Sequence, residues 1–389
     1  MRILFTFAGG TGHLDPLVPI ARAMEAAGHA AAFAARPWMV PKVEALGFVA
    51  LPAGSDEGLT PVRRPLLPLD SAREERDMRD GFARRIARER AVELLTLAAD
   101  WRPDLIVWEE TDFAAPVVAE HLDLPHAAVT VIAAGTFVRT GLVAEPLNEL
   151  RAEYGLTPDP ELVMLRRHLV LSPIPPGFRD PVAPLPTTAY EFRPFSVEPS
   201  SRESSPPWSV GLPGAKTVYF TLGTVFNMES GDLFSRILSG LRELPVNLVV
   251  TVGRDLDPLE LGQQPANVHI ERFIPQSVVL PHCDLVVSHG GSGSVVGALA
   301  HGLPMLLAPM GADQPSNAGR CEALGLGRVL DVITATPAEV RDAAALLLAD
   351  PTYRSAADRI REKFVALPGP ESTVPLLERL ATDRSLSAT

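Results

Sequence analysis

The stretch VVSHGGSGSVVGALAHGLPMLLAPMGADQ, residues 286–314, decides the fold of this chain. It reads in order as an apolar strand, a glycine loop, a helix, a second strand and an acidic loop. The glycines of HGGSG remove side chains that would keep a ligand away from the backbone. A helix that begins near Ser294 offers backbone N–H groups that bind phosphate without a metal ion. The stretch therefore predicts a site for a phosphorylated ligand, and a nucleotide sugar fits it.

Composition sets the frame for this site. The chain has 389 residues, of which 46% are hydrophobic, enough for two cores, and its net charge of -12 argues against a nucleic-acid partner. Cys283 and Cys321 are the only cysteines, which excludes a disulfide framework and a four-cysteine metal site. The N-terminal stretch MRILFTFAGG has too short an apolar core for a secretory signal, and no apolar run reaches the roughly 18 residues of a membrane span. We expect a cytoplasmic protein without stable membrane insertion.

The first half of the chain alternates short apolar strands with helices, which predicts a parallel sheet. The expected strands cover residues 3–8, 30–35 and 105–108, and a helix covers 17–27. Within residues 71–100, Met78, Phe82 and Ile86 recur every fourth position, as in a helix with one apolar stripe. The Arg and Glu residues of this helix are interpreted as a solvated face.

A proline-rich segment separates the two halves, because 11 of the 38 prolines lie between residues 173 and 213. After it the alternation restarts, with expected strands at 218–222, 248–252, 268–271, 285–288 and 305–308. The prediction is an α/β fold with two Rossmann-like parallel-sheet domains that face each other across a cleft. The boundaries are a first domain at 1–195, a linker at 196–214, a second domain at 215–367 and a C-terminal helix, not assigned to either domain, at 368–389.

The first loop, GGTGH at residues 9–13, starts a GxG pattern that could bind a dinucleotide. The third glycine of that fingerprint would fall on Asp15, and the second strand ends in Ala35-Arg36 without the acid that binds a ribose. His13 is instead interpreted as a general base on a glycine loop, kept neutral by a neighbouring helix start. Glu109 and Glu110 follow the strand at 105–108, and an acid there could hold the imidazole tautomer.

Three further loops of the second half follow predicted strands. Residues 221–224, TLGT, suit phosphate, residues 273–276, FIPQ, suit a nucleobase, and Asp313-Gln314 suits sugar hydroxyls. The glycines 291, 293 and 297 also allow an NADP site, but His289 and the Asp-Gln loop have no role in it. Asp255-x-Asp257 has the spacing of a metal-binding DxD, but we expect it to cap the helix that Pro258 begins. No metal site is predicted.

These motifs together resemble the nucleotide-sugar glycosyltransferases of the GT-B fold. The closest likeness is to the bacterial natural-product branch of the UDP-glycosyltransferase superfamily, whose members modify antibiotics, macrolides and other polyketides. The resemblance rests on GGTGH, TLGT, FIPQ, SHGGSGSVVGAL and GADQPSNAGR, which occur in the family's order and spacing. It extends over nearly the whole chain.

The resemblance implies roles for individual residues. His13 matches the family's general base, and Glu109 matches the carboxylate that supports it. The residues expected around the donor's pyrophosphate are Thr224, His289, Gly291, Ser292 and Gly293. Those expected near its nucleobase are Phe273, Ile274 and Gln276. Asp313 and Gln314 are expected to contact its sugar. The first domain would bind the acceptor and the second the donor, with no cofactor beyond the nucleotide sugar itself.

One departure from the family affects the expected donor. Many members that use UDP-sugars have a glutamate for the ribose hydroxyls where this chain has Gly297. Because that acceptor is missing, we expect a dTDP-sugar rather than a UDP-sugar.

The expected activity is an inverting, metal-independent transfer of a sugar or deoxysugar to a hydroxyl of a hydrophobic aglycone. Residues 61–69, the helix from Ser71 and residues 133–143 are candidate acceptor walls. The competing hypotheses are a non-catalytic sugar-nucleotide-binding partner subunit, an NAD(P)-dependent oxidoreductase and a sugar-nucleotide epimerase. A homodimer is compatible with the sequence.

Overall fold

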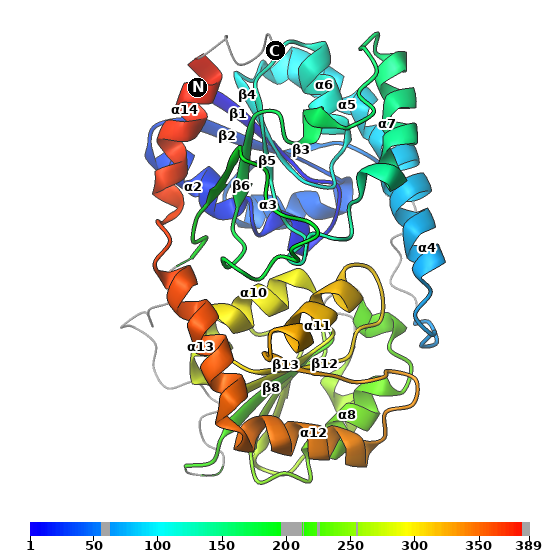
Figure 1. The fold of residues 1–389 in the computed structure, drawn as a ribbon, viewed down its shortest axis with the longest axis vertical. Coiled ribbons are helices and arrows are strands. Elements are labelled where there is room, and N and C mark those ends of the chain that lie inside the picture. Colours follow the sequence, from blue (N-terminus) through cyan, green and yellow to red (C-terminus); the bar gives the residue numbers. More distant parts are fainter. Residues whose placement is uncertain (56–62, 196–211, 213, 224–225, 254–255, 383–389) are drawn as a thin grey trace.

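Two parallel β-sheets organise the chain in a computed structural model, which describes all residues except 56–62, 196–211, 213, 224–225, 254–255 and 383–389 (Figure 1). The first sheet has the order β3-β2-β1-β4-β5-β6-β7 and the second the order β10-β9-β8-β11-β12-β13. The first comprises β1 Arg2–Thr6, β2 Ala30–Ala35, β3 Val49–Pro52, β4 Leu105–Glu109, β5 His126–Val129, β6 Leu169–Ser172 and β7 Ala189–Glu191. The second comprises β8 Thr217–Thr221, β9 Asn247–Thr251, β10 Val268–Glu271, β11 Leu285–Ser288, β12 Met305–Leu307 and β13 Gly327–Val329.

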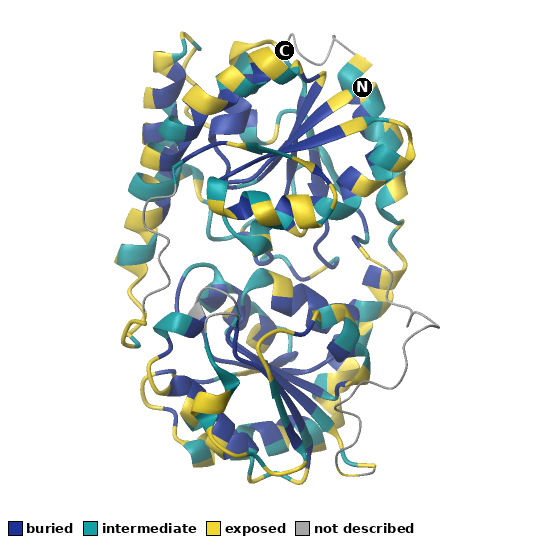
Figure 2. Cartoon of the chain, turned by 180° about the vertical axis from the view of Figure 1, so that it is seen from behind, coloured by how far each residue is buried: buried dark blue, intermediate teal, exposed yellow. Residues whose placement is uncertain are grey.

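Helices cover the sheets, and the central strands of each sheet are buried (Figure 2). Strand β4, with the sequence LIVWE, is buried at every position, as expected for a strand inside a parallel sheet. The helices of the first half are α1 Thr11–Leu14, α2 Val18–Ala26, α3 Val40–Ala45, α4 Ser71–Arg76, α5 Ala87–Trp101, α6 Ala114–His121 and α7 Thr140–Glu153. Those that follow β8 are α8 Leu233–Leu241, α9 Gln276–Val279, α10 Ser292–Ala300, α11 Gln314–Ala323, α12 Pro337–Ala349, α13 Pro351–Val365 and α14 Val374–Thr382.

The strand order reverses at the same place in both sheets. In the first, β1 pairs with β2 on one side and β4 on the other, and in the second β8 pairs with β9 and β11. The crevice beyond the carboxyl ends of such strands is where ligands of α/β sheets bind. The predicted α/β fold with two Rossmann-like sheets is confirmed.

The expected strands at 30–35, 268–271 and 285–288 have the predicted bounds, and the others differ by one or two residues at an end. Strands β3, β5, β6, β7 and β13 were not predicted. Strand β5 shows why, because its sequence HAAV has little of the β-branched and aromatic content that marks a strand. Pairing with β4 and β6 holds it in place instead.

The helix expected over residues 71–100 forms, but its middle is wound differently. Between α4 and α5 lies the π-helical segment η2, Asp77–Ile86. Met78 and Ile86 are buried as predicted, and Phe82 is half-buried. The solvated-face interpretation is wrong for Arg90, which is 0% exposed and forms a buried ion pair with Asp112.

The C-terminal segment joins both halves. Helix α13 packs against α10, whereas α14 returns to the first sheet and contacts α2, β5 and β6 (Figure 1). Leu377 and Leu380 of α14 are buried in the core of β1 and β2. Of the expected linker 196–214, the structure describes only residues 212 and 214. Within the described part of the chain, no helix is long and apolar enough to cross a membrane.

Candidate active site

His13 lies at the carboxyl end of β1, in the one-turn helix α1 and not on an open loop as expected. Its imidazole occupies the space above Gly9, where a Cβ would collide with the ring atoms Cδ2 and Nε2. Any larger residue at position 9 would displace the ring. The first glycine of GGTGH therefore makes room for the histidine.

A carboxylate and a hydroxyl hold the Nδ1 side of this ring. Nδ1 of His13 lies 3.2 Å from Oε2 of Glu109 and 3.2 Å from Oγ1 of Thr111. The Thr111 hydroxyl donates to Glu109 at 2.8 Å, so it can only accept from His13. Both partners are thus acceptors, which puts the proton of the neutral ring on Nδ1 and leaves the Nε2 lone pair for a substrate proton. Thr111 was not predicted, although it follows the same strand two residues after Glu109.

The carboxylate of Glu109 is fully buried and receives further hydrogen bonds from the backbone N–H groups of Ala8 (3.0 Å) and Thr111 (2.8 Å). Burial opposes the charge on this group, but His13 and these two hydrogen bonds bring the pKa of Glu109 below its ordinary value. Glu109 is therefore ionised beside the imidazole.

The pKa of His13 is raised above 6.5, contrary to the expectation that a helix start lowers it. Burial alone would lower this pKa, but the charge and hydrogen bond of Glu109, together with Asp313 and Glu110, outweigh burial. The Asp313 carboxylate contributes to this raised pKa, so it lies within electrostatic reach of His13. The ring accepts a proton more readily than an isolated imidazole does.

The turn after β4 is fixed by a buried network. Arg90 donates to Asp112 at 2.7 Å and 3.0 Å, to the Ala53 carbonyl at 2.7 Å and to the Thr6 hydroxyl at 2.7 Å. Thr6 in turn donates to Asp112. Glu110 points away from His13, because its Oε1 accepts from the backbone N–H groups of Val131 and Ile132. Of the two candidate carboxylates, only Glu109 contacts His13.

Two aromatic residues lie close to His13. The Phe82 ring is nearly parallel to the imidazole, at an interplanar angle of 13° and a centroid separation of 6.4 Å. Trp38, 39% exposed, lies beside Gly10, where a Cβ would be 3.2 Å from its ring. Trp38 was not among the predicted acceptor walls, and its only sequence signal is its position just after the second strand.

His289 follows β11 in the second sheet and also lies between glycines. A Cβ on Gly223 or on Gly291 would each come within 2.6 Å of its ring. Its Nδ1 is buried and has no hydrogen-bond partner among the described residues. Burial lowers the pKa of His289 to about 4, so the ring is neutral at pH 7. Gly223 and Gly291, which come from segments predicted to lie near phosphate, therefore leave space for the His289 ring.

Helix α10 begins at Ser292, two residues before the expected start, with Gly291 as its N-cap residue. The Ser292 hydroxyl donates to Oδ2 of Asp313 at 2.5 Å and accepts from the Ala133 N–H of the first domain at 2.7 Å. Asn317, which was not predicted, donates to Asp313 at 2.8 Å and accepts from Ala134 N–H at 2.9 Å. The first turns of α10 and α11 therefore contact the first domain directly.

The other predicted donor residues have different surroundings. Gln314 is 1% exposed, and its Oε1 accepts from Met310 N–H at 2.8 Å, which holds the loop before α11. Ile274 is buried in the second-domain core, whereas Phe273 is 47% exposed. Gln276 donates to Ser294 at 3.1 Å. The donor roles of these residues stay predictions, and Thr224 lies outside the described residues.

Comparison with known proteins decides the family. Residues 22–153 match the N-terminal domain of the Erythromycin biosynthesis protein CIII-like family, and residues 235–380 match the C-terminal domain of the same family. The 4'-demethylrebeccamycin synthase of Lentzea aerocolonigenes is 30% identical over 97% of this chain and 99% of its own length. The chain belongs to this family of bacterial natural-product glycosyltransferases.

Other relatives agree with this assignment. Tylactone mycaminosyltransferase of Streptomyces fradiae is 29% identical over 98% of this chain and 92% of its own length. Among solved structures, the spinosyn rhamnosyltransferase SpnG complexed with thymidine diphosphate has a TM-score of 0.81 and 26% identity, and the match covers 97% of this chain and 100% of SpnG. The glycosyltransferase has the GT-B fold, and the oxidoreductase and epimerase hypotheses are set aside.

Among the described residues of this glycosyltransferase, no group of three or more His, Cys, Asp or Glu side chains is placed to hold a metal ion. Asp257 of the DxD sequence accepts from Leu259 N–H at 3.1 Å and caps the short helix that Pro258 begins, as predicted. Asp255 lies outside the described residues. Cys283 and Cys321 are buried and unpaired, and burial raises the pKa of both thiols.

Proposed function

We propose that this glycosyltransferase moves a sugar or deoxysugar from a dTDP-sugar to a hydroxyl of a hydrophobic aglycone, with inversion and without a metal ion. His13 is the general base. The observation that carries this proposal is the fixed tautomer of His13, whose Nδ1–H faces the acceptors Glu109 and Thr111, both at 3.2 Å. That arrangement leaves Nε2 as the proton-accepting atom.

The reaction is a single displacement at the anomeric carbon. The acceptor oxygen forms a bond to this carbon on the face opposite the diphosphate, while its proton passes to Nε2 of His13. The bond between the anomeric carbon and the phosphate oxygen breaks, and its electron pair leaves with the nucleoside diphosphate. Glu109 stabilises the imidazolium that forms, as the carboxylate of a catalytic triad does.

The second domain supplies the groups for the leaving diphosphate. Helix α10, residues Ser292–Ala300, presents its N-terminus at the glycine loop, and helix N-termini bind phosphate oxygens. His289, with its pKa near 4, acts there as a neutral hydrogen-bonding ring and not as a cation. These groups take the place of a metal ion, and the nucleotide sugar is a co-substrate that makes a further cofactor unnecessary.

A dTDP-sugar is the favoured donor because of the surroundings of Gly297. A Cβ at this position would lie 2.9 Å from Oε1 of Gln276 and 3.0 Å from Cδ1 of Leu280, so no larger side chain fits without rearrangement. Because residue 297 is glycine, the chain has no carboxylate at this position for a ribose 2′-hydroxyl. In support, the relative SpnG was solved with thymidine diphosphate and the glycosyltransferase VinC with dTDP.

The acceptor hypothesis rests on the apolar surroundings of His13. Phe82 lies beside His13 and Trp38 lies beside Gly10 of the same glycine-rich segment, and aromatic faces bind apolar ring systems. In support, SpnG was also solved with the spinosyn aglycone. Relatives with 29% identity include a tylactone mycaminosyltransferase and a 10-deoxymethynolide desosaminyltransferase.

The proposal is tested by turnover with dTDP- and UDP-linked forms of one sugar against a panel of aglycones. We expect glycosylated product by mass spectrometry, inverted anomeric configuration by NMR, and a kcat/KM for dTDP-sugar about 10-fold or more above that for UDP-sugar. Activity should persist in EDTA. A clear preference for UDP would refute the donor assignment, and binding of nucleotide without any product would favour the partner-subunit hypothesis.

A further inference from the structure

A segment of the first domain crosses to the second domain. We call residues 63–76, which end with helix α4, the bridging arm. In Figure 1, α4 extends from the first domain toward the second. Arg64 N–H donates to the Met228 carbonyl at 2.8 Å, and Arg63 pairs with Glu260 at 2.6 Å. The bridging arm is thus attached to the second domain by both backbone and side-chain contacts.

Apolar packing adds to these polar contacts. Leu66 is partly buried against the second-domain core around β8 and β9. Gly231 lies beneath it with a φ of +51°, and a Cβ there would come within 3.0 Å of the Leu66 backbone nitrogen. Gly231 thus allows the close approach of the bridging arm.

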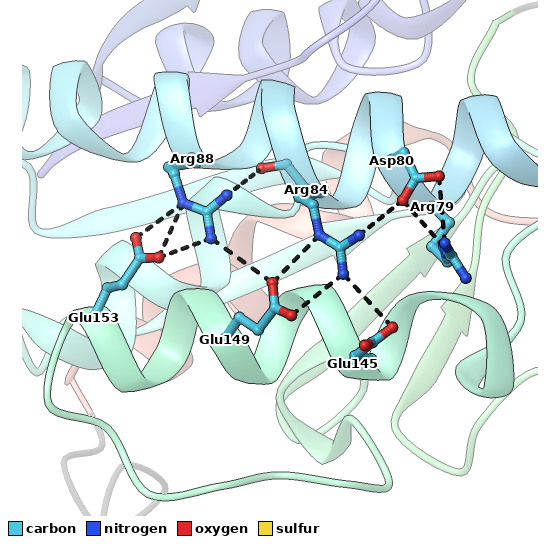
Figure 3. Close-up of polar contacts among 7 residues, drawn as sticks. All are labelled: Arg79, Asp80, Arg84, Arg88, Glu145, Glu149 and Glu153. Atoms are coloured by element: carbon cyan, nitrogen blue, oxygen red, sulfur yellow. Dashed lines mark hydrogen bonds and ion pairs between the residues drawn. The ribbon is translucent and has the colours of Figure 1, made fainter.

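The other end of the bridging arm is anchored on the first domain. It continues into η2 and α5, and these lie beside α7 with a ladder of ion pairs between them (Figure 3). Arg84 pairs with Glu149 at 3.3 Å and Arg88 with Glu153 at 2.7 Å. The pairs recur at four-residue spacing on both helices, so they favour one register. Each exposed pair is weak alone, but together they hold the base of the bridging arm.

Glu74 of the bridging arm contacts the donor loop. Its side chain is 16% exposed, and its Oε2 accepts from the backbone N–H of Ala312 at 2.8 Å. Ala312 has a φ of +53°, a left-handed conformation that is unfavourable for alanine. The next residue is Asp313, the predicted contact for the donor sugar. Glu74 therefore stabilises a strained turn immediately before that contact.

We propose that Glu74 is a positioning residue for the donor sugar, which acts across the domain boundary by holding the turn at Ala312. This inference rests on the proposed role of Asp313 in binding the sugar. Because the same helix carries Phe82 beside His13, it links the acceptor side of the base to the loop that orients the donor. A donor sugar binds productively only when the bridging arm is docked.

The decisive measurement compares the sugar with the bare nucleotide. Glu74→Ala should raise the KM for the nucleotide sugar about 10- to 100-fold, as expected for loss of one hydrogen bond to a charged group. Affinity for dTDP alone, measured by calorimetry, should stay within about 2-fold, because dTDP lacks the sugar that Asp313 binds. Glu74→Gln should restore most of the KM, since its amide oxygen can accept from Ala312 N–H. Glu75→Ala is the matched control, because Glu75 is exposed and pairs with Arg139.

A second variant tests the strained turn. Glycine adopts a φ near +53° without strain, so Ala312→Gly should reduce the effect of Glu74→Ala on KM. An unchanged KM in a folded Glu74→Ala protein would overturn the proposal, as would equal losses for dTDP and for the nucleotide sugar or a failure of Glu74→Gln to restore KM. Asp313→Ala distinguishes failure of the proposed sugar contact from failure of the role of Glu74. If Asp313→Ala leaves the KM for the nucleotide sugar unchanged, Asp313 does not bind the sugar. If Asp313→Ala raises this KM and Glu74→Ala does not, only the role of Glu74 is refuted.

Discussion

His13 and His289 follow different strands of the two sheets, and their pKa values are shifted in opposite directions. His13 follows β1, whereas His289 follows β11, which has the place of β4 in its own sheet, and each ring lies against glycine. His13 has Glu109 at 3.2 Å and a raised pKa, whereas His289 has no partner on Nδ1 among the described residues and a pKa near 4. Of these two histidines packed against glycine, only the one beside a carboxylate has a raised pKa, and the neighbouring charge makes the difference.

The largest expected effect comes from removing the base. His13→Ala should lower kcat by about 10²- to 10⁴-fold, because the acceptor oxygen must then attack without losing its proton to a positioned group. Affinity for dTDP should not change. Steady-state kinetics with calorimetry for dTDP would measure both, with His121→Ala at an exposed helix end as the control. Normal turnover would remove His13 from the mechanism.

A smaller effect is expected when the carboxylate is neutralised. Glu109→Gln should lower kcat/KM at the plateau of the pH profile by about 10- to 100-fold, which is the effect expected for the loss of a hydrogen bond to a buried charge. Glu109 raises the pKa of His13, and a base works only when deprotonated, so wild-type activity falls as pH drops through a pKa above 6.5. Without that charge the pKa of His13 falls, and the acidic limb of the pH profile should move to lower pH.

The pH profile of kcat/KM between pH 5 and 9 measures this shift. An acidic limb that stays in place, or moves to higher pH, in Glu109→Gln would show that another group sets the pKa of His13. Glu110→Gln provides a comparison at the neighbouring carboxylate, which contacts backbone N–H groups and not the imidazole.

The smallest effect should come from His289. His289→Ala should weaken dTDP binding by about 3- to 10-fold, as for one neutral hydrogen bond. In the free wild-type protein the His289 ring should titrate near pH 4 by NMR, and dTDP should raise this pKa because the diphosphate stabilises the charged ring. A ring that is already charged at pH 7 without ligand would contradict the comparison.

The free energy of unfolding, measured as a function of pH, also tests the lowered pKa of His289. Between pH 6.5 and 4 the unfolded chain binds a proton at His289 that the folded chain does not, so unfolding becomes easier as pH falls. Part of this loss should be absent in His289→Ala. His126 behaves similarly, since burial lowers its pKa to about 3, and it remains in both proteins.

Much of the architecture was predictable because parallel sheets bury their strands on both faces. Strand runs such as β8 and β11 are therefore apolar in sequence. Strand β5 was missed because pairing with its neighbours, and not its own residues, makes it a strand. The return of α14 to the first sheet was equally absent from the sequence, because an amphipathic helix shows that it packs but not against which surface.

By itself the sequence determined the family, the two-sheet fold and the candidacy of His13 and Glu109, because glycine loops and apolar strands are local patterns. Cytoplasmic location and a homodimer stay predictions. Tertiary structure alone decided that Glu109 and not Glu110 contacts His13, that the Thr111 hydroxyl also contacts its Nδ1, and that Glu74 reaches Ala312 in the other domain. These are contacts between residues distant in sequence, and their strength depends on burial and distance, which exist only once the chain has folded.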